Sequence, residues 1–376
     1  MRKVWLALAA LLVSGSLSAA ASTSPPKSYM LKTRRSVSRL AADGARVAVA
    51  TTTTAENTCD RIVVWSPLKR SSVGFKTGIN CETSSAINEI LEIALANKRV
   101  AWIEADGGNY LDLSLRSRVL GSKKQTTTIA SASNGNGAAE ESSGDYVGNM
   151  FGDGGVLAFN YWSECMAIPV GWEGEQTCPD PAPGDQPITI FSGQKLLKIV
   201  NGKGVAIASA PDVVASGLHT MSLKIVAVDA RRIATQRPDG SVAIYSAGVS
   251  AWKRMAVPNG TFSGFAFQGS QLATVRNGDL DLYDVDTGLL TQTIPLAAGS
   301  KLRDLQRGLA VYLRGRKIHV LRLADEKDVT YAPPGKGSVD AQIESSGLFY
   351  SYNYERGRSP GRVVFVPFAA VLKKLG

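Results

Sequence analysis

The sequence predicts an all-β fold built from a unit that repeats about every 40 residues. A turn containing glycine or aspartate recurs along the chain, and a triplet of apolar, small and apolar residues follows it. The last four triplets begin at residues 233, 272, 309 and 348, so successive copies lie 39, 37 and 39 residues apart. Short strands at this period are typical of the blades of a β-propeller. The seven triplets occupy residues 47–49, 100–102, 157–159, 233–235, 272–274, 309–311 and 348–350. We therefore predict seven blades of four antiparallel strands, although six or eight also fit the pattern.

The strands within one blade follow from alternation and turn chemistry. In the fifth repeat, residues 272–275 predict a strand, and Asn277-Gly278 predicts a tight turn because both residues tolerate a positive φ. Residues 280–285 and 290–294 predict the next two strands. The fourth, sixth and seventh repeats follow the same plan. The early triplets are 53, 57 and 76 residues apart, which indicates insertions in the first half of the chain.

The N-terminal residues have the features of a secretory signal peptide. Arg2-Lys3 precedes an apolar run over residues 4–13, and small residues end at Ala19-Ala20-Ala21. This run is shorter than the roughly 20 residues that span a bilayer. We therefore predict a signal peptide over residues 1–21, cleavage near Ala21, and a secreted or extracytoplasmic protein.

The strand repeat divides the rest of the chain into three parts. Residues 22–35 form an N-terminal segment whose residues 28–33 are a candidate outer strand that closes the ring. Residues 36–370 are assigned to the propeller and residues 371–376 to a C-terminal tail. The end of the chain, residues 368–375, predicts a short amphipathic helix, which we expect to pack on the ring rather than on a membrane.

One stretch of the first repeat resembles a known family. Residues 40–49, which read Leu-Ala-Ala-Asp-Gly-Ala-Arg-Val-Ala-Val, are similar to the Ser-Pro-Asp-Gly phrase of TolB-like and WD-repeat-like propellers. Ala42 stands where that phrase has proline, and the Trp-Asp dipeptide of WD repeats is absent. Residues 283–288 resemble a strand–turn phrase of many propellers. The resemblance covers nearly all of residues 36–370 and implies the fold, but it carries no catalytic residues.

The four cysteines predict disulfides rather than a metal site. Cys59, Cys81, Cys165 and Cys178 include no pair separated by two residues, and an exported chain meets an oxidising environment. The pairs Cys59–Cys81 and Cys165–Cys178 each close a local loop, and both crossed pairings remain open. The formal net charge of +10 is compatible with an anionic partner, but export argues against nucleic acid.

The long loops are expected to gather on one face of the ring. In a four-stranded blade, the loop after the second strand and the loop into the next blade emerge on the same side. Residues 51–60, 78–88, 131–145 and 163–187 all belong to these loops, and residues 163–187 contain acids but no lysine or arginine. Long loops on a rigid scaffold often bind partners. The candidate binding residues are Trp162, Glu164, Trp172, Glu173, Glu175 and Asp180.

Motifs for catalysis are missing from the sequence. It has no Gly-x-Ser-x-Gly elbow, phosphate loop or His-Glu-x-x-His motif. Of its two histidines, His319 lies in a predicted strand and His219 in a connector without a carboxylate nearby in sequence, so we expect neither to be catalytic. Calcium is the one cofactor considered, on Asp279, Asp281, Asp284 and Asp286, but strand and turn roles explain these residues better. We therefore expect no cofactor and no catalytic or metal-binding residue.

The sequence thus predicts a monomeric, non-catalytic propeller that binds a protein or a ligand of the cell envelope. Its acidic, disulfide-linked loop face is the expected recognition surface. A first alternative is a lactonase- or lyase-like propeller enzyme with a divalent ion in its channel or on its top face. A second alternative is a basic protein held on anionic polymers of the envelope. For this alternative the basic turns at residues 314–317 and 356–358 would supply the contacts.

Overall fold

A computed structural model provides the structure of the chain. It describes residues 28–52, 61–77, 87–107, 110–123, 125–136, 142–171, 173, 178, 180–182, 184–215, 221–246, 252–257, 261–355 and 360–376. The predicted signal peptide lies outside the described residues. Cys59, Cys81, Trp172, Glu175 and His219 also lie outside them.

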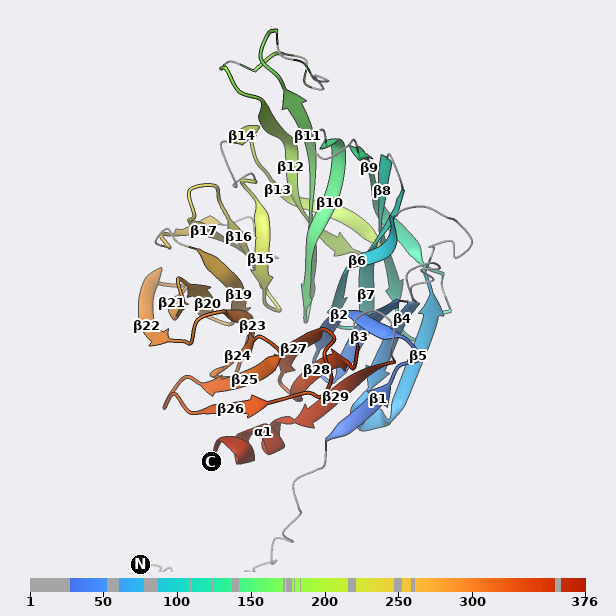
Figure 1. Ribbon diagram of the computed structural model, residues 1–376, viewed down its shortest axis with the longest axis vertical. Coiled ribbons are helices and arrows are strands. Elements are labelled where there is room, and N and C mark those ends of the chain that lie inside the picture. Colours follow the sequence, from blue (N-terminus) through green and yellow to red (C-terminus); the bar gives the residue numbers. More distant parts are fainter. Residues whose placement is uncertain are drawn as a thin grey trace, which may run out of the picture.

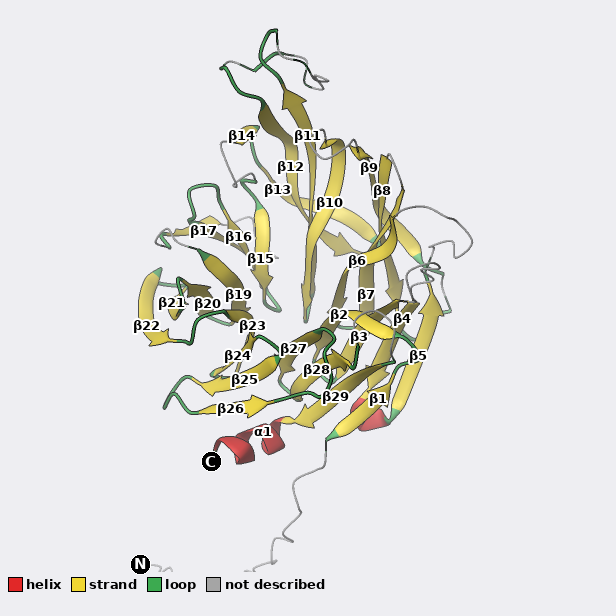
Figure 2. Cartoon of the chain, viewed as in Figure 1, coloured by secondary structure: helices red, strands yellow, loops and turns green. Residues whose placement is uncertain are grey.

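The described strands form antiparallel sheets arranged in a ring around a central channel (Figure 1). In sequence order, each sheet begins with its innermost strand and continues outward by hairpins, as Figure 2 also shows. The first sheet comprises β2 (Ser36–Asp43), β3 (Arg46–Thr52), β4 (Arg61–Ser66) and β5 (Ser71–Lys76), with a 3-10 helix at Pro67–Lys69. Three later sheets have the same order. They comprise β15 (Lys224–Val228), β16 (Arg232–Gln236), β17 (Val242–Ser246) and β18 (Trp252–Met255); β19 (Phe262–Gln268), β20 (Gln271–Arg276), β21 (Asp279–Asp284) and β22 (Leu289–Pro295); and β23 (Ser300–Gln306), β24 (Leu309–Arg314), β25 (Lys317–Arg322) and β26 (Asp328–Tyr331).

One larger sheet of nine strands occupies the early part of the ring. Its members are β6 (Ile87–Ala96), β7 (Arg99–Gly107), β8 (Tyr110–Val119), β9 (Thr127–Asn136), β10 (Ser142–Asp153), β11 (Val156–Ala167), β12 (Ile188–Val200), β13 (Lys203–Ser209) and β14 (Val213–Ala215). The pairing between β9 and β10 spans three residues of each strand, so it joins two halves that each have the usual order. Counting these halves separately gives seven units around the ring. The number of blades stays a prediction.

The last sheet combines both ends of the described chain. Its strands are β27 (Val339–Glu344), β28 (Gly347–Asn353) and β29 (Gly361–Pro367), and β1 (Tyr29–Lys32) is the outermost strand. β1 pairs antiparallel with β29 over its whole length, from Tyr29 opposite Phe365 to Lys32 opposite Arg362. An N-terminal strand in the C-terminal sheet removes one free sheet edge and fixes the two ends of the ring together.

The repeated triplets form the second strand of each sheet or half-sheet, namely β3, β7, β11, β16, β20, β24 and β28. Their central residue is fully buried in every copy, alanine in six and Phe349 in the seventh. The described core clusters explain this pattern, because all but one small cluster contain residues of two neighbouring sheets or half-sheets. The second strand is covered on both faces, so it lacks the polar alternation of a half-exposed strand.

The C-terminal helix α1 (Phe368–Leu375) packs on the ring. Its buried residues, Val371 and Leu375, belong to the core cluster that joins the β23–β26 sheet to the last sheet. The Lys374 Nζ lies 3.9 Å from the ring centroid of Tyr331, which adds a cation–π contact. None of the described helices has the length and apolar character needed to cross a membrane.

Buried asparagines join neighbouring sheets through paired hydrogen bonds. The amide of Asn353, on β28, accepts from the Val37 N–H at 2.9 Å and donates to the Val37 carbonyl at 2.8 Å. Asn160, on β11, accepts from the Ile225 N–H at 2.9 Å and donates to the Leu223 carbonyl at 2.8 Å. Each amide therefore satisfies backbone groups of the next innermost strand, which faces no further strand on that side.

We expect Asn353→Ala to lower the free energy of unfolding by about 2 kcal/mol, because it leaves two buried backbone groups of Val37 without partners. Chemical denaturation monitored by tryptophan fluorescence measures this change. Gln125→Ala is a suitable control, since Gln125 is exposed and lies between β8 and β9, outside both strands. Equal stability of the two variants would contradict the proposed role of Asn353.

Candidate functional site

The predicted acidic loop of residues 163–187, called the hairpin head below, is partly a continuation of the sheet. β11 runs to Ala167 and β12 begins at Ile188, and these two residues pair with each other. The expectation of a loop from residue 163 is therefore wrong for its first five residues. Residues 131–145 likewise lie largely in β9 and β10, whose described ends pair with each other. The apolar and β-branched residues at both ends favour strand continuation over a free loop.

The hairpin head has its own small structure. A disulfide joins Cys165 to Cys178, as the local pairing predicts, with a Cα–Cα distance of 5.0 Å. The Cys178 N–H donates to the Met166 carbonyl at 3.0 Å, and the Ala182 N–H donates to the Ile168 carbonyl at 3.0 Å. A cluster of buried apolar residues lies beneath these bonds: Ala167, Cys178 and Ala182, with Cys165, Ile188 and Ile190 beside them. The described residues of the head therefore extend the β11–β12 hairpin, which projects from the ring (Figure 1).

Trp162 and Glu164 lie at the base of the hairpin head and contact each other. The Trp162 Nε1–H donates to Glu164 Oε1 at 2.6 Å, and the indole stacks on Tyr146 with ring centroids 5.4 Å apart. Burial raises the pKa of the Glu164 carboxyl, although the bond from Trp162 opposes this shift. Both candidate residues are half-buried. They therefore contribute to the attachment of the head more than to its outer surface.

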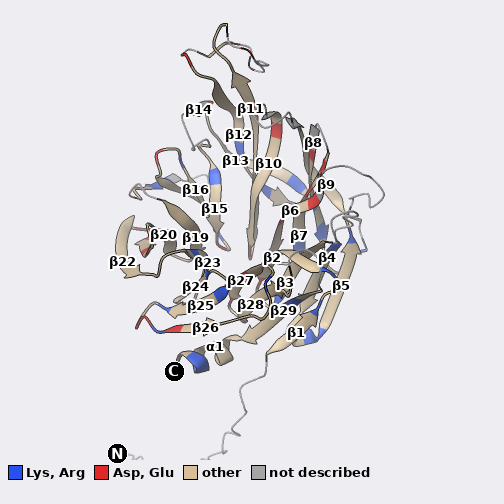
Figure 3. Ribbon diagram, viewed as in Figure 1, with Lys and Arg blue, Asp and Glu red and all other residues tan. Residues whose placement is uncertain are grey.

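The outer surface of the hairpin head is acidic and carries an exposed apolar residue. Glu173, Asp180 and Asp185 are exposed, and Val170 is 86% exposed. Figure 3 shows acidic residues on this projecting part of the chain. Of the candidate residues, Glu173 and Asp180 thus lie on the surface, whereas Trp172 and Glu175 are outside the described residues. The head presents negative charge beside an apolar side chain.

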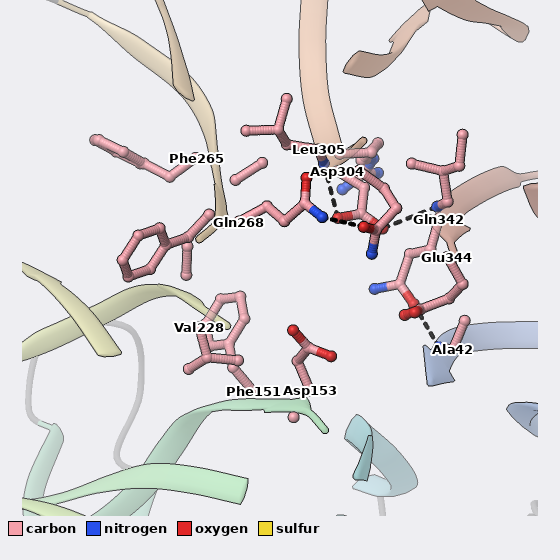
Figure 4. A pocket seen from close by; sticks show the side chains of 17 residues that line it. Ala42, Phe151, Asp153, Val228, Phe265, Gln268, Asp304, Leu305, Gln342 and Glu344 are labelled. Atoms are coloured by element: carbon pink, nitrogen blue, oxygen red, sulfur yellow. Dashed lines mark hydrogen bonds between the residues drawn. The ribbon is translucent and has the colours of Figure 1, made fainter. Parts of the chain in front are cut away.

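A second candidate site lies inside the ring, and the sequence did not predict it. A cavity of about 80 Å³ is enclosed by the ends of the innermost strands, where each strand turns into the second strand. Three carboxylic acids line it: Asp153 from β10, Asp304 from β23 and Glu344 from β27. Figure 4 shows these side chains converging from different sheets, together with Gln268 and Gln342.

Two of these acids, Asp304 and Glu344, accept hydrogen bonds from the backbone of a neighbouring sheet. Asp304 accepts from the N–H of Leu305 and from the N–H of Ile343, each at 2.8 Å. Glu344 accepts from the Gly44 N–H at 3.1 Å. Asp43, at the same level of the ring, accepts from the Gly154 N–H at 2.9 Å. The acids therefore connect the turns of different sheets.

Gly154 is required at this narrow end of the channel. Its φ is +48°, and a Cβ atom there would lie 2.6 Å from the Cβ of Ala230. Both the left-handed backbone and the close approach of the next turn exclude a larger residue. The Asp-Gly phrase of the sequence therefore places a carboxyl in the channel and a glycine at the contact between turns.

Burial and mutual repulsion raise the pKa values of these acids, so they stay protonated at a higher pH than ordinary carboxyl groups do. Burial raises the pKa of Asp153 to about 6, with further contributions from the charges of Asp43 and Asp229. Burial raises the pKa of Asp304 to about 7. For Glu344, burial and then the charge of Asp304 raise the pKa to about 9. Near neutral pH the cluster therefore carries less negative charge than its residue count indicates.

A sequence signal for this cluster existed in the repeat itself. Asp43, Asp153 and Glu344 are each the last residue of an innermost strand, and Asp229 directly follows one. Gln268 and Gln306 occupy this position in two further sheets. Residues at one position of a circular repeat must lie at one level of the ring. The sequence predicts turns at Asp43 and Asp153, but sequence alone does not show how closely the turns of different repeats approach each other.

The aspartates considered for calcium have other contacts. Asp281 is fully buried and bonds to Arg276 at 2.8 Å and to Thr293 at 2.8 Å. Asp284 accepts from the Thr287 N–H at the following turn, and Asp286 lies 3.2 Å from Arg232. Within the described part of the chain, no group of three or more His, Cys, Asp or Glu is placed to hold a metal.

His319 is buried in the outer strands of the β23–β26 sheet. Its Nδ1 lies 3.0 Å from Asp328 Oδ2, and its ring stacks on Tyr312 with centroids 4.7 Å apart. The Tyr312 hydroxyl donates to the same Asp328 oxygen at 2.5 Å. These contacts lie away from both candidate sites and join three neighbouring strands.

Comparison with known proteins finds distant structural likenesses and gives no role. No model of a protein family and no curated protein matches the sequence. The structure is similar to a chain of the mitotic checkpoint complex, with 13% identity, 98% of this chain and 99% of that chain covered, and a TM-score of 0.49. It is also similar to BamB from Moraxella catarrhalis (11% identity, 87% and 84% covered, TM-score 0.40) and to the Pan2 WD40 domain of Neurospora crassa (12%, 89% and 90%, 0.45). These likenesses are too distant to assign a role. The ring of antiparallel sheets in the described residues itself makes the chain a β-propeller.

Removal of the disulfide with Cys165→Ser and Cys178→Ser should loosen the hairpin head and leave the ring intact. The bond closes a loop with a sequence separation of 13, and a loop of this size contributes about 3 kcal/mol in the chain-entropy description. Limited proteolysis should therefore cleave within residues 168–187 much faster, while the main thermal transition stays near that of the original protein. An unchanged cleavage rate would contradict this account.

The channel acids predict a stability that falls as pH rises. An unfolded carboxyl releases its proton near about pH 4. Asp304 and Glu344 hold theirs in the folded protein to about 7 and about 9. The folded state thus binds more protons over this interval, so the free energy of unfolding decreases with increasing pH. Thermal melts at pH 5 and pH 8 should show the lower melting temperature at pH 8.

Glu344→Gln should reduce this pH dependence, because the amide oxygen can still accept from Gly44 but does not ionise. Asp325→Asn is a matched control that should leave the pH dependence unchanged, since Arg322 lowers the pKa of Asp325 and this carboxyl is therefore ionised throughout the interval from pH 5 to pH 8. Melting temperatures that fall equally with pH in the original protein and in Glu344→Gln would contradict the role of Glu344.

Proposed function

We propose that this protein is a non-catalytic binding scaffold that works outside the cytoplasm and recognises a cationic or amphipathic partner with its hairpin head. One observation carries the proposal. The head projects from the ring, is held by the Cys165–Cys178 disulfide, and exposes Val170 beside Glu173 and Asp180. We also propose that the protein is related to the TolB-like or WD-repeat-like propellers.

The order of the hairpin head supports a role in binding. A surface that is already fixed loses less conformational entropy when a partner binds. The disulfide and the backbone bonds from Cys178 and Ala182 provide this order. The exposed valine can be buried by a partner, at a gain of roughly 25 cal/mol for each Å² of apolar surface.

The charge of the hairpin head supports a cationic partner. Residues 163–187 contain five acids and neither lysine nor arginine, whereas the whole chain carries a formal charge of +10. A local surface of the opposite sign orients a basic partner toward the head, and the positive remainder discourages other orientations. The disulfide is compatible with an oxidising compartment, and this compatibility supports the proposal that the protein is exported.

The double charge reversal Glu173→Lys and Asp180→Lys tests the recognition surface. The immobilised protein is incubated with an extract of the cell envelope, and the retained proteins are identified and quantified. We expect a partner retained by the original protein to be lost or reduced about tenfold, because two attractive contacts become repulsive. Binding by the original protein should also weaken in moderate salt.

The control variant is Glu326→Lys, which reverses a charge at an exposed turn of another sheet. It should retain the same partners as the original protein. If the head variant and the control retain partners equally, the hairpin head is not the recognition surface. A variant with residues 168–187 replaced by a short turn gives a second reading, because it removes Val170 as well as the acids.

A further inference from the structure

The central channel contains a second, larger cavity whose surroundings differ from those of the acidic end. It has a volume of about 520 Å³ and is lined by the innermost strands of several sheets, including β2, β6, β15, β19 and β23. Its lining includes Lys224 and Phe262, which begin their strands, and Gln236, which ends β16. The cavity therefore lies toward the face from which the β11–β12 hairpin projects.

Three cationic side chains from three different sheets line this cavity. They are Arg39 on β2, Lys224 on β15 and Arg303 on β23, and all three residues are exposed. Their separation in sequence means that only the closed ring brings them together. Arg303 also lines the acidic cavity, whereas Arg39 and Lys224 line the larger cavity but not the acidic one.

The carboxylates near this cavity do not balance its cations. Glu92 also lines the cavity, but its two oxygens accept from the N–H groups of Asn149 and Met150, at 3.0 and 2.6 Å. Arg303 forms an ion pair with Asp340, with 3.4 Å between Nε and Oδ1.

Arg39 and Lys224 have no ion pair among the described residues. Arg39 donates to the carbonyls of Leu91 and Ser38, and its charge also acts on the carboxyls of Glu92 and Asp340, where it opposes the rise of their pKa values. No partner of Lys224 is found in the described part of the chain. Three cations thus stand against two carboxyls, and Lys224 is the cation most available to an anionic ligand.

The remaining wall of the cavity is apolar and partly aromatic. Phe262 and Phe265, from β19, lie with ring centroids 5.1 Å apart, and Phe151 from β10 is also part of the lining. These rings are half-buried and so present part of their surface to the cavity. Cavities of roughly 300–1,000 Å³ with an apolar wall and a few polar groups are typical sites for small molecules.

We propose that this cavity binds a small organic anion, in which a carboxylate, sulfonate or phosphate group is joined to a flat apolar body. The anionic group contacts Lys224, Arg39 and Arg303, and the apolar body packs against Phe262 and Phe265. The inference does not depend on the hairpin head, since none of these residues belongs to it.

The test uses two fluorescent probes of the same shape. Anilinonaphthalene sulfonate carries one negative charge, and phenylnaphthylamine is its uncharged relative. We expect saturable binding of the sulfonate at one site per folded protein and much weaker binding of the uncharged probe. Lys224→Gln and Arg39→Gln should each weaken sulfonate binding about tenfold, because each removes one charged contact.

Lys317→Gln is the matched control, since it makes the same chemical change at an exposed turn outside the cavity. Near-ultraviolet circular dichroism confirms that each variant keeps its fold. Equal binding of the two probes, equal affinity of Lys224→Gln and Lys317→Gln, or the absence of saturable binding would each overturn the proposal. The Glu173→Lys and Asp180→Lys variant should bind the sulfonate as the original protein does, so failure at one site is separable from failure at the other.

Discussion

The free edge of each innermost strand is the constraint on which the ring depends. One side of such a strand pairs with the next strand outward, and the other side faces the channel with unpaired N–H and carbonyl groups. Unpaired backbone groups removed from water are costly. Side chains of the neighbouring sheet bond to them instead: Glu92 to Asn149 and Met150, Asp304 to Ile343, and Gln342 to Ala42. Each sheet is thereby fixed to the next one, in addition to the apolar packing between their faces.

These bonds between side chains and free strand edges determine the electrostatics of the channel. A carboxyl that accepts from the backbone of the next sheet has to lie inside the ring, where burial and neighbouring acids raise its pKa, as for Glu344 and Asp304. Lys224 begins β15 and lines the larger cavity, which does not include these acids, whereas Arg303 lines both cavities. The cations of the larger cavity are exposed, and the acids that bond to a strand edge are buried or half-buried.

Much of the fold could be predicted from local residues. The triplets gave the second strand of every unit because a strand covered on both faces must be apolar on both, and the Asn277-Gly278 turn appears where its chemistry requires it. The local pairing of Cys165 with Cys178 was also predictable, since a short loop favours it. The start of the hairpin head was not predicted correctly, because pairing with residues 188–192 extends β11 through a stretch that reads as polar.

The sequence by itself determined the repeat and the strand order within a unit, because these depend on turns and periodicity. Only the tertiary structure decided which distant residues meet. Asp43 and Gly154, or Arg39 and Lys224, come together through closure of the whole ring. In the sequence, each acid of the repeated turn therefore looks like a residue that only stabilises its own turn. In the closed ring the same residues lie close together, because equivalent positions of the sheets converge on one axis.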